Sequence, residues 1–496
     1  MKAGRLYTIR SGYDAASRSP EAMRHWREAD RLSPDAALSA QTRGIIISRA
    51  RYECANNGYA DGIIQTLAED TIGTGPRLQL NEMQGAEPVQ KERHVQTRMA
   101  LQRREMRFRE WCDAIDLTEK LRTARMAKAR DGEVFIRLLR NPQIEGVVKI
   151  DIDLYEAEQV GSRMLTEYSE FWPNGQAKEF DGISYDQYGN PDKYRFWRIH
   201  PGAAGLAFVR DDSYQVSAKE VIHYAHIVRP GQHRGLSEIA STLAIFNDLR
   251  RYTNAVLAAA ETAAEISFVL QTDTPADEGD GQGQQGQTLQ FMDVVELVRN
   301  SGIAMPEGWK ANQMHAEHPT DRYVDFVDAK LAEAARPLSM PFAVAKGDCS
   351  KSNYASGRLD HQTYHKRIIG ERNRIEKKIL NRLLKVFESI DAIAYPEDYK
   401  ADTIVHSWMW DNWEHVDPVK EATAQAIRLA NRTTTLADEC AREGKDYELV
   451  LNQIAIETQM AMERGIQAPA QNTAEAIANN VVKALKQEDN EHGEKE

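Results

Sequence analysis

Two histidines, His361 and His365, have the spacing in this chain that best fits a catalytic metal site. They lie one helical turn apart, as do the zinc ligands of the peptidase motif H-E-x-x-H. That motif also requires a glutamate as general base, and Gln362 occupies its position here. The pair therefore fits a solvated or packed helix face better than a metallopeptidase centre, and a hydrolase is the least favoured of the functions weighed.

Other motifs of catalytic chemistry are incomplete as well. His223, His226 and His233 have no carboxylate at a fixed spacing that would make them a metal site. The stretch 281–286 matches the dinucleotide pattern G-x-G-x-x-G, but acidic residues precede it where a strand is required. No G-x-x-x-x-G-K-[ST] loop occurs. We therefore expect no catalytic residue, no metal, no cofactor and no enzymatic activity.

The segment 346–358 has a composition that suits contact with a phosphate backbone. Lys346, Lys351 and Arg358 stand among small polar residues, so the segment can touch phosphates without reading bases. A plain linker between two helices is the alternative. The helix expected over 359–390 carries many lysines and arginines, which form either a solvated face or a second phosphate-facing surface.

Three tryptophans, Trp408, Trp410 and Trp413, could stack on bases. Rings at alternate positions more often form one buried face of a strand, and we favour that interpretation.

Composition limits the function classes further. The formal net charge of -12 argues against a protein that wraps DNA on one broad basic surface, while leaving room for DNA that must stay mobile. The 4 cysteines are far apart, which suggests neither a disulfide framework nor a cysteine zinc site and favours a reducing compartment. The apolar runs are too short to span a bilayer, so no membrane partner is expected.

The elements that must position these residues follow from periodicity and turn signals. The bend Arg229-Pro230-Gly231 precedes a long amphipathic helix expected to run to about Ile266, and a second helix is expected from Thr320 to Arg336. Two helices should meet at Asn56-Asn57-Gly58, a strand should follow at 77–80, and residues 133–224 show the period of two that predicts a β-rich domain.

The order of these parts resembles the lambda-type portal proteins of tailed bacteriophages. Each matching motif is short, and their joint order from about residue 43 to 464 makes the resemblance specific. The motifs are 57–60 with 73–75, 130–135, 182–184 with 186–191, 232–237, 347–350 with 353–358, 416–421 and 444–446.

The resemblance implies an α+β, portal-type fold assembled as a ring. Its parts would be an N-terminal arm (1–33), a mixed α/β wing (34–234), a stem helix (235–266), a small α/β clip (267–319), a second stem helix (320–339), a tunnel loop (340–358), a long tunnel helix (359–395), a segment returning to the wing (396–417), a helical crown (418–465) and a disordered tail (466–496).

Two groups of site residues follow from the same resemblance. The DNA-channel tunnel loop would use Lys346, Asp348, Ser350, Lys351, Ser352, Asn353 and Arg358. The stem and the joint between wing and stem would use Gly231, Arg234, Gly235, Phe246, Arg250, Arg251, Val324 and Val327.

The implied function is a ring-shaped channel of about twelve copies at one capsid vertex, for packaging, retention and ejection of DNA. The implied partners are further copies of the chain, double-stranded DNA without sequence specificity, the terminase large subunit, the major capsid protein, a head-tail adaptor and a scaffold protein. The protein would reside in the virion, and in the host cytoplasm during assembly. A capsid-associated adaptor without a pore is the main alternative.

Overall fold

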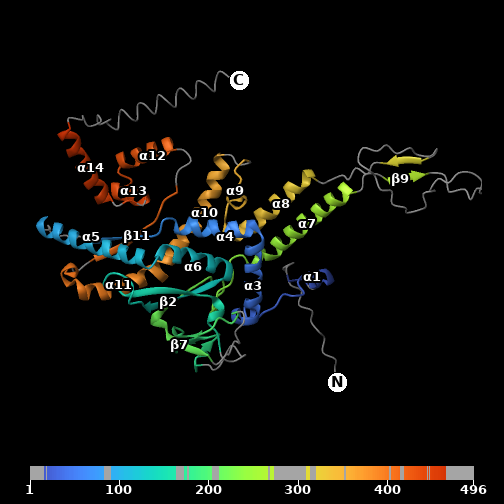
Figure 1. Cartoon of the computed structure of the whole chain (residues 1–496), viewed down its shortest axis with the longest axis horizontal. Helices are drawn as coiled ribbons and strands as arrows, with labels where there is room; N and C mark the ends of the chain where they lie inside the picture. The colour runs from blue at the N-terminus through green and yellow to red at the C-terminus, as the bar shows by residue number, and fades with distance from the viewer. Residues whose placement is uncertain are drawn as a thin grey trace, which may run out of the picture. The chain divides into compact units, whose positions relative to one another are not determined.

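The computed structural model of the chain describes residues 16–17, 19–82, 91–162, 172–175, 178–203, 212–265, 269–272, 309–312, 320–350, 354–400, 404–413, 418–443, 445 and 447–464. The chain divides into two compact units, unit 1 (Met1–Ala240 with Asn353–Glu496) and unit 2 (Ser241–Ser352) (Figure 1). Residues 1–15 and 18 of the predicted arm, the predicted tail and the stretch 281–286 lie outside the described residues.

Unit 1 begins with helices, the first four of which have a serine or asparagine side chain that caps the N-terminus. They are α1 (Pro20–His25), α2 (Pro34–Ala37), α3 (Ala40–Asn56), α4 (Gly58–Ile72), α5 (Lys91–Ala114) and α6 (Leu117–Asp131). The predicted break between two helices is confirmed at Asn57, whose side chain accepts a hydrogen bond from the Tyr59 N–H at 3.1 Å and so caps α4. Gly73, with φ of 56°, ends α4.

The predicted β-rich domain is confirmed as two antiparallel sheets in unit 1. One has the order β3-β2-β8, from β2 (Glu133–Arg140), β3 (Ile150–Tyr155) and β8 (Val221–Ala225). The other has the order β4-β5-β6-β7, from β4 (Glu179–Phe180), β5 (Ile183–Tyr185), β6 (Pro191–Trp197) and β7 (Ser213–Ser217). Strand β3 starts only at Ile150, after a turn in which the Asn141 N–H donates to the carbonyl of Lys149 at 2.9 Å.

Strand β2 divides the core of unit 1 into two layers. Val134 and Ile136 belong to a cluster formed with helices, including Trp111 of α5 and Phe387. Phe135, between them, belongs to a second cluster with residues of the four-stranded sheet. Successive side chains of a strand point to opposite faces, so β2 has helices on one face and a sheet on the other.

The long helix predicted from 359 starts earlier and contains a turn of π-helix. It consists of α10 (Tyr354–Ile375), the π-turn η6 (Glu376–Leu380) and α11 (Asn381–Ala394). Strand β11 (Ile404–Met409) then pairs with the predicted strand, β1 (Arg77–Glu82), with Arg77 opposite Met409. The chain continues with α12 (Pro418–Ala430), α13 (Leu436–Arg442) and α14 (Tyr447–Glu463).

Unit 2 is built around two helices that lie side by side, α7 (Leu243–Glu265) and α8 (Thr320–Ala335) (Figure 1). Leu249 of α7 is buried against Val327 and Leu331 of α8. Tyr252 and Tyr323 stack with their ring centroids 5.8 Å apart. Strands β9 (Val269–Thr272) and β10 (Trp309–Asn312) pair antiparallel, and the short α9 (Phe342–Lys346) follows α8.

The prediction that one helix runs from 235 to 266 is wrong at its start, because α7 begins only at Leu243, after the 3-10 turn η4 (Ala240–Thr242). The preceding N–H groups bond other parts of unit 1. The Leu236 N–H donates to the carbonyl of His226 at 3.1 Å, and the Glu238 N–H to that of Ala129 at 2.9 Å. The segment before α7 is therefore built into unit 1 instead of continuing the helix.

Candidate functional site

The predicted joint around Arg234 is organised by Glu133, at the boundary between α6 and β2. Gly132, with φ of 96°, ends α6, and Glu133 opens the strand. The Glu133 side chain is completely buried, on the same face of β2 as Phe135. A buried carboxylate is costly unless positive charges and hydrogen-bond donors surround it.

Arg234 provides most of that compensation. Its Nε donates to Glu133 Oε1 at 2.8 Å, and Nη1 reaches Asp181 Oδ2 at 2.7 Å. The remaining donors reach backbone carbonyls, including that of Ala157 at 2.8 Å. Only 1% of the side chain is exposed, so its five donors are used inside the protein. Arg234 therefore ties the 229–239 segment to both sheets.

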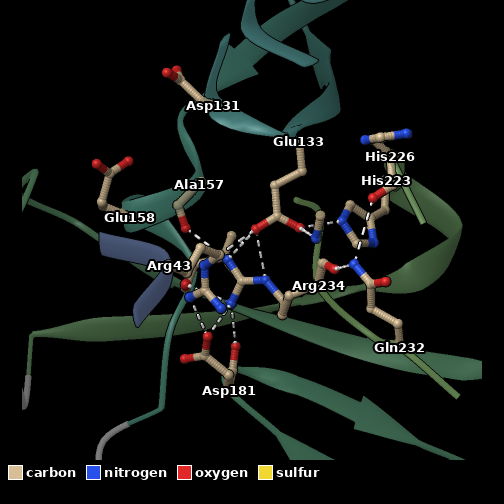
Figure 2. A network of polar contacts seen from close by, with 12 residues as sticks. Arg43, Asp131, Glu133, Ala157, Glu158, Asp181, His223, His226, Gln232 and Arg234 are labelled. Atoms are coloured by element: carbon tan, nitrogen blue, oxygen red, sulfur yellow. Dashed lines mark hydrogen bonds and ion pairs between the residues drawn. The ribbon is translucent and has the colours of Figure 1, made fainter. Parts of the chain in front are cut away.

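A second arginine, Arg43 of α3, reaches the same pair of carboxylates (Figure 2). It ion-pairs with Asp181, and its Nε lies 3.7 Å from Glu133 Oε1. Burial alone would raise the pKa of the Glu133 carboxyl, but Arg234, with smaller contributions from His223 and Arg43, holds that pKa well below its usual range. Asp181 shows the same balance, its pKa lowered by Arg234 and Arg43 against the effect of burial. Both carboxylates are thus ionised, and two arginines face two acids.

The joint also requires close contact between two glycines. A Cβ on Gly235 would lie 2.2 Å from the Gly132 carbonyl oxygen, and a Cβ on Gly132 would lie 2.5 Å from the carbonyl carbon of Leu236. The Gly235 N–H donates to Glu133 Oε2 at 2.8 Å. Side chains at either position would push the segment off the carboxylate.

Two histidines flank the Glu133 carboxylate and its segment. Nε2 of His223 lies 2.8 Å from Glu133 Oε2, and the ring stacks on Phe135 at 4.5 Å. Nδ1 of His226 lies 2.8 Å from the carbonyl oxygen of Leu236. Burial lowers the pKa of both histidines below the ordinary value, although Glu133 acts in the opposite direction on His223 and Glu238 on His226.

The lowered pKa of His223 predicts a loss of stability in mild acid. The unfolded chain binds a proton below about pH 6.5, where the folded His223 is still neutral. Its contribution is therefore present above that pH and falls as the pH drops towards the folded pKa, by up to about 1.4 kcal/mol per pH unit. We expect His223→Gln to flatten the decline of unfolding free energy between pH 6.5 and 5 in denaturant titrations.

The exposed His25 of α1 provides the matched control, because His25→Gln should leave the slope unchanged. An unchanged slope in His223→Gln as well would show that His223 does not cause the acid sensitivity.

A second buried charge cluster lies directly after the joint. The Glu238 carboxylate accepts hydrogen bonds from both terminal nitrogens of Arg125, each at 3.0 Å, and from Arg367 at 2.9 Å. Lys128 ion-pairs with Glu371 of α10 and lies 3.6 Å from Glu238. Burial lowers the pKa of Lys128 despite these carboxylates. The cluster binds α6, α10 and the 235–239 segment together, and sequence reasoning did not find it because its members are far apart in the chain.

The predicted tunnel loop contains a capped turn rather than a freely exposed lysine. Lys346 ends α9, and its Nζ lies 2.9 Å from Asp328 Oδ1 of α8 and 3.3 Å from Asp348 Oδ2, with 16% of the side chain exposed. Gly347, with φ of 72°, caps the helix. Hydrogen bonds from Ser350, with Lys346 nearby, lower the pKa of Asp348 to about 2. The charge of Lys346 is thus engaged within unit 2.

The other predicted tunnel-loop residues have different positions. Lys351, Ser352 and Asn353 lie outside the described residues. The prediction that Arg358 belongs to a loop is wrong: the residue lies on α10, which begins at Tyr354, and it is exposed.

The remaining predicted joint and stem residues divide by burial. Gly231, with φ of 76°, forms the predicted bend. On α7, Phe246 is buried, Arg250 is half-buried and Arg251 is exposed. On α8, Val327 is buried against α7, whereas Val324 on the same helix is exposed.

Comparison with known proteins assigns the chain to a family. A sequence profile described as "Phage portal protein, lambda family" matches residues 19–372, more than half of the chain. The chain belongs to the lambda family of phage portal proteins. Portal proteins are structural components of the virion.

Individual relatives are more distant. A "Probable portal protein" of Halomonas phage phiHAP-1 is 24% identical over 449 residues, covering 85% of this chain and 81% of the relative. A structure described as "Neck of native GTA particle computed with C12 symmetry" has 14% identity and a TM-score of 0.43, covering 81% of this chain and 93% of that one. An HK97 family portal protein from Corynebacterium diphtheriae has 12% identity and a TM-score of 0.26, covering 79% and 99%.

The histidine pair of this portal protein is packed on α10. His365 stacks on Trp413 with the ring centroids 3.9 Å apart, and His361 lies beside it at 5.8 Å. Within the described ranges, the grouping that could hold a metal is Glu156, Glu158 and His200, which does not include the pair. The Arg51 guanidinium lies 3.0 Å from the Glu158 carboxylate, so the negative charge of this group of residues is already paired with a cation from the protein.

In this portal protein, Trp408 and Trp410 and several cations of the long helix form hydrogen bonds within the chain. Trp410 is buried and donates to Glu376 at 2.7 Å, and Trp408 donates to Asn381 at 2.8 Å, so both rings are packed as favoured. The prediction of a single strand face is wrong, because β11 ends at Met409 and Trp410 and Trp413 follow it. Arg372 donates to the carbonyl of Thr71 at 2.9 Å, and Arg382 to that of Val221 at 2.8 Å. Over the described residues, none of the helices has the length and apolar character needed to cross a bilayer.

Proposed function

We propose that about twelve copies of this chain close into a ring at one capsid vertex and form the channel through which double-stranded DNA enters and leaves. The match to the lambda portal family over residues 19–372 is the observation that carries the proposal. The channel holds DNA without sequence specificity, and the chain itself catalyses no reaction.

The parts of the ring follow the chain. The packed pair α7 and α8 forms the stem, residues 267–319 form the clip, and residues 34–234 form the wing with the segment 396–417. Residues 340–358 form the tunnel loop, 359–395 the long helix behind it, and 418–465 the crown. The packing of Leu249 on Leu331 and of Tyr252 on Tyr323 supports a rigid stem.

The C-terminal helices supply a reason for the chains to associate. Large apolar side chains are exposed on α12 and α14, among them Val419, Ile427, Ile454, Ile456 and Met462. Exposed apolar surface of this kind commonly marks an interaction site. In a ring, head-to-tail contact between neighbouring crowns covers it.

DNA in the channel must be held near the axis and still slide. The net charge of -12 supplies repulsion, and the engaged Lys346 offers little attachment. The ring would dock the terminase large subunit, the major capsid protein, a head-tail adaptor and a scaffold protein. It assembles in the host cytoplasm and remains in the virion.

The test is to purify the full chain and examine it by electron microscopy and native mass spectrometry. Closed rings with an open axial pore are expected. A stable monomer, or a compact oligomer without a pore, would overturn the channel and favour a capsid-associated adaptor.

Cys349 offers a direct test of the tunnel-loop position. It is exposed in the turn after Lys346, whereas Cys54 is buried and burial raises its pKa to about 11. A sulfonate-bearing methanethiosulfonate should therefore place one negative charge per subunit at the loop. About 1 kcal/mol of repulsion near each phosphate corresponds to a roughly 5-fold change in rate. We expect packaging to slow by at least that factor, measured as DNA protected from nuclease.

A trimethylammonium reagent of similar size should instead slow DNA release. Cys349→Ser treated with either reagent is the control. Equal effects of the two reagents would place Cys349 away from the DNA.

A further inference from the structure

A hollow on unit 1 lies between α5, α11 and the turn before β3. Its volume is about 300 Å³, at the lower end of ligand pockets, which suits one or two side chains rather than a folded domain. Its lining includes Trp111, Val148 and Phe387, all buried. The Trp111 indole N–H donates to the carbonyl of Ile150 at 2.9 Å, so this N–H group is not available to hydrogen-bond a molecule in the hollow.

The rim of the hollow is acidic. Arg107 lines it, but its Nε and Nη2 both bond Asp391, at 2.9 and 2.7 Å, and its Nη1 bonds Asp398 at 2.9 Å. Its charge is therefore matched by two carboxylates. Glu110 and Glu145 also line the hollow, are exposed, and form no ion pair among the described residues. The site thus combines an apolar floor with unpaired negative charge, which fits an apolar side chain flanked by lysine or arginine.

We propose that residues 2–10 of a neighbouring copy of this chain occupy the hollow. That stretch, Lys-Ala-Gly-Arg-Leu-Tyr-Thr-Ile-Arg, holds three cations and the apolar Leu6, Tyr7 and Ile9, with no acidic residue. The stretch 477–486 is the other candidate by composition. It has only Lys483 and Lys486, and Glu475 and Glu488 flank it. Charge complementarity therefore favours residues 2–10.

The neighbouring copy is favoured over the same copy by the course of the chain after residue 16. The Asp35 carboxylate accepts a hydrogen bond from the His233 backbone N–H at 3.0 Å. Its second oxygen lies 2.7 Å from Nδ1 of the His233 ring. The Leu32 carbonyl accepts from Arg229 at 3.0 Å. These contacts fix the start of the described chain beside the joint, and α1 and α11 lie at opposite sides of unit 1 in Figure 1. The inference rests on the proposed ring, in which each subunit has a neighbouring copy on either side.

The experiment pairs Tyr7→Cys with Val147→Cys, a residue of the hollow that is 41% exposed, in the Cys349→Ser background of the full chain. Mild oxidation should yield covalently linked dimers and larger species on a denaturing gel. Mixing the two single variants before assembly should yield dimers only. Cross-linking confined to monomers would show binding within one copy and overturn the proposal, as would the absence of cross-linking.

Charge reversal and an alternative probe make the test specific. Lys2→Glu with Arg5→Glu and Arg10→Glu should reduce cross-linking at least 10-fold, and Glu110→Lys with Glu145→Lys should restore it. Ala484→Cys paired with Val147→Cys should give no product, and efficient cross-linking there would assign the hollow to residues 477–486 instead. Electron microscopy of every sample separates the outcomes: missing rings contradict the proposed function, whereas intact rings without cross-linking contradict only this inference.

Discussion

Gly235→Ala is expected to prevent the chain from reaching its folded state. The added Cβ would lie 2.2 Å from the Gly132 carbonyl oxygen and 2.7 Å from the Glu133 Cβ. Neither the Gly132 backbone nor the Glu133 Cβ is the end of a flexible side chain, so the 229–239 segment must move and the Gly235 N–H must leave Glu133. We expect a loss of more than about 4 kcal/mol, seen as insoluble protein or as loss of the wild-type peak in size-exclusion chromatography.

Gly44→Ala provides the matched control. Gly44 lies within α3, and nothing stands within 4 Å of the position its Cβ would take. Alanine should stabilise the helix by up to about 1 kcal/mol there. Wild-type stability in Gly235→Ala would mean that the close contact between the two glycines is not required.

Arg234→Leu is expected to destabilise the chain by about 3–5 kcal/mol, because Glu133 and Asp181 would stay buried with one guanidinium fewer. The measurement is the denaturant midpoint by circular dichroism. The apparent loss should shrink below pH 5, where protonation of the two acids removes part of the uncompensated charge.

Arg49→Leu is the control for the loss of an arginine as such, since Arg49 is exposed on α3 and forms no ion pair among the described residues. Its effect should stay within about 0.5 kcal/mol. Equal destabilisation by both variants would contradict a special role for Arg234.

Local patterns in the sequence predicted the elements whose boundaries are set locally. The caps at Asn57 and Gly73 act on neighbouring backbone groups, so their residue types are sufficient. In β2, side chains at successive positions pack alternately into the two hydrophobic clusters, so the period of two in the sequence predicts both faces of the strand. The start of α7 could not be predicted, because Leu236, Ile239 and Leu243 have helical spacing while the N–H groups nearby bond distant carbonyls.

The sequence identified the separate motifs of the joint around Arg234, but not their contact. The motifs around Gly132-Glu133 and Arg234-Gly235 both contributed to the family resemblance, but nothing in the sequence says that they touch across 101 positions. Lys346 looked free for DNA because Asp328, its partner at 2.9 Å, lies on the preceding helix. Ion pairs between distant residues leave no periodic signal, whereas helices and strands do.

The π-turn η6 constrains how the length of this chain can change. Before it, Arg372 and Glu371 of α10 reach the α4–α6 side of unit 1, and after it Leu383 and Phe387 of α11 enter the core. Deleting one residue from 376–380 would convert the turn to ordinary α-helix. Because a π-turn holds one residue more than an α-turn, α10 and α11 would keep their faces after that deletion, whereas a deletion within either helix would rotate the two parts by roughly 100°. We therefore expect a single-residue deletion at the π-turn to be tolerated better than one in the helices on either side.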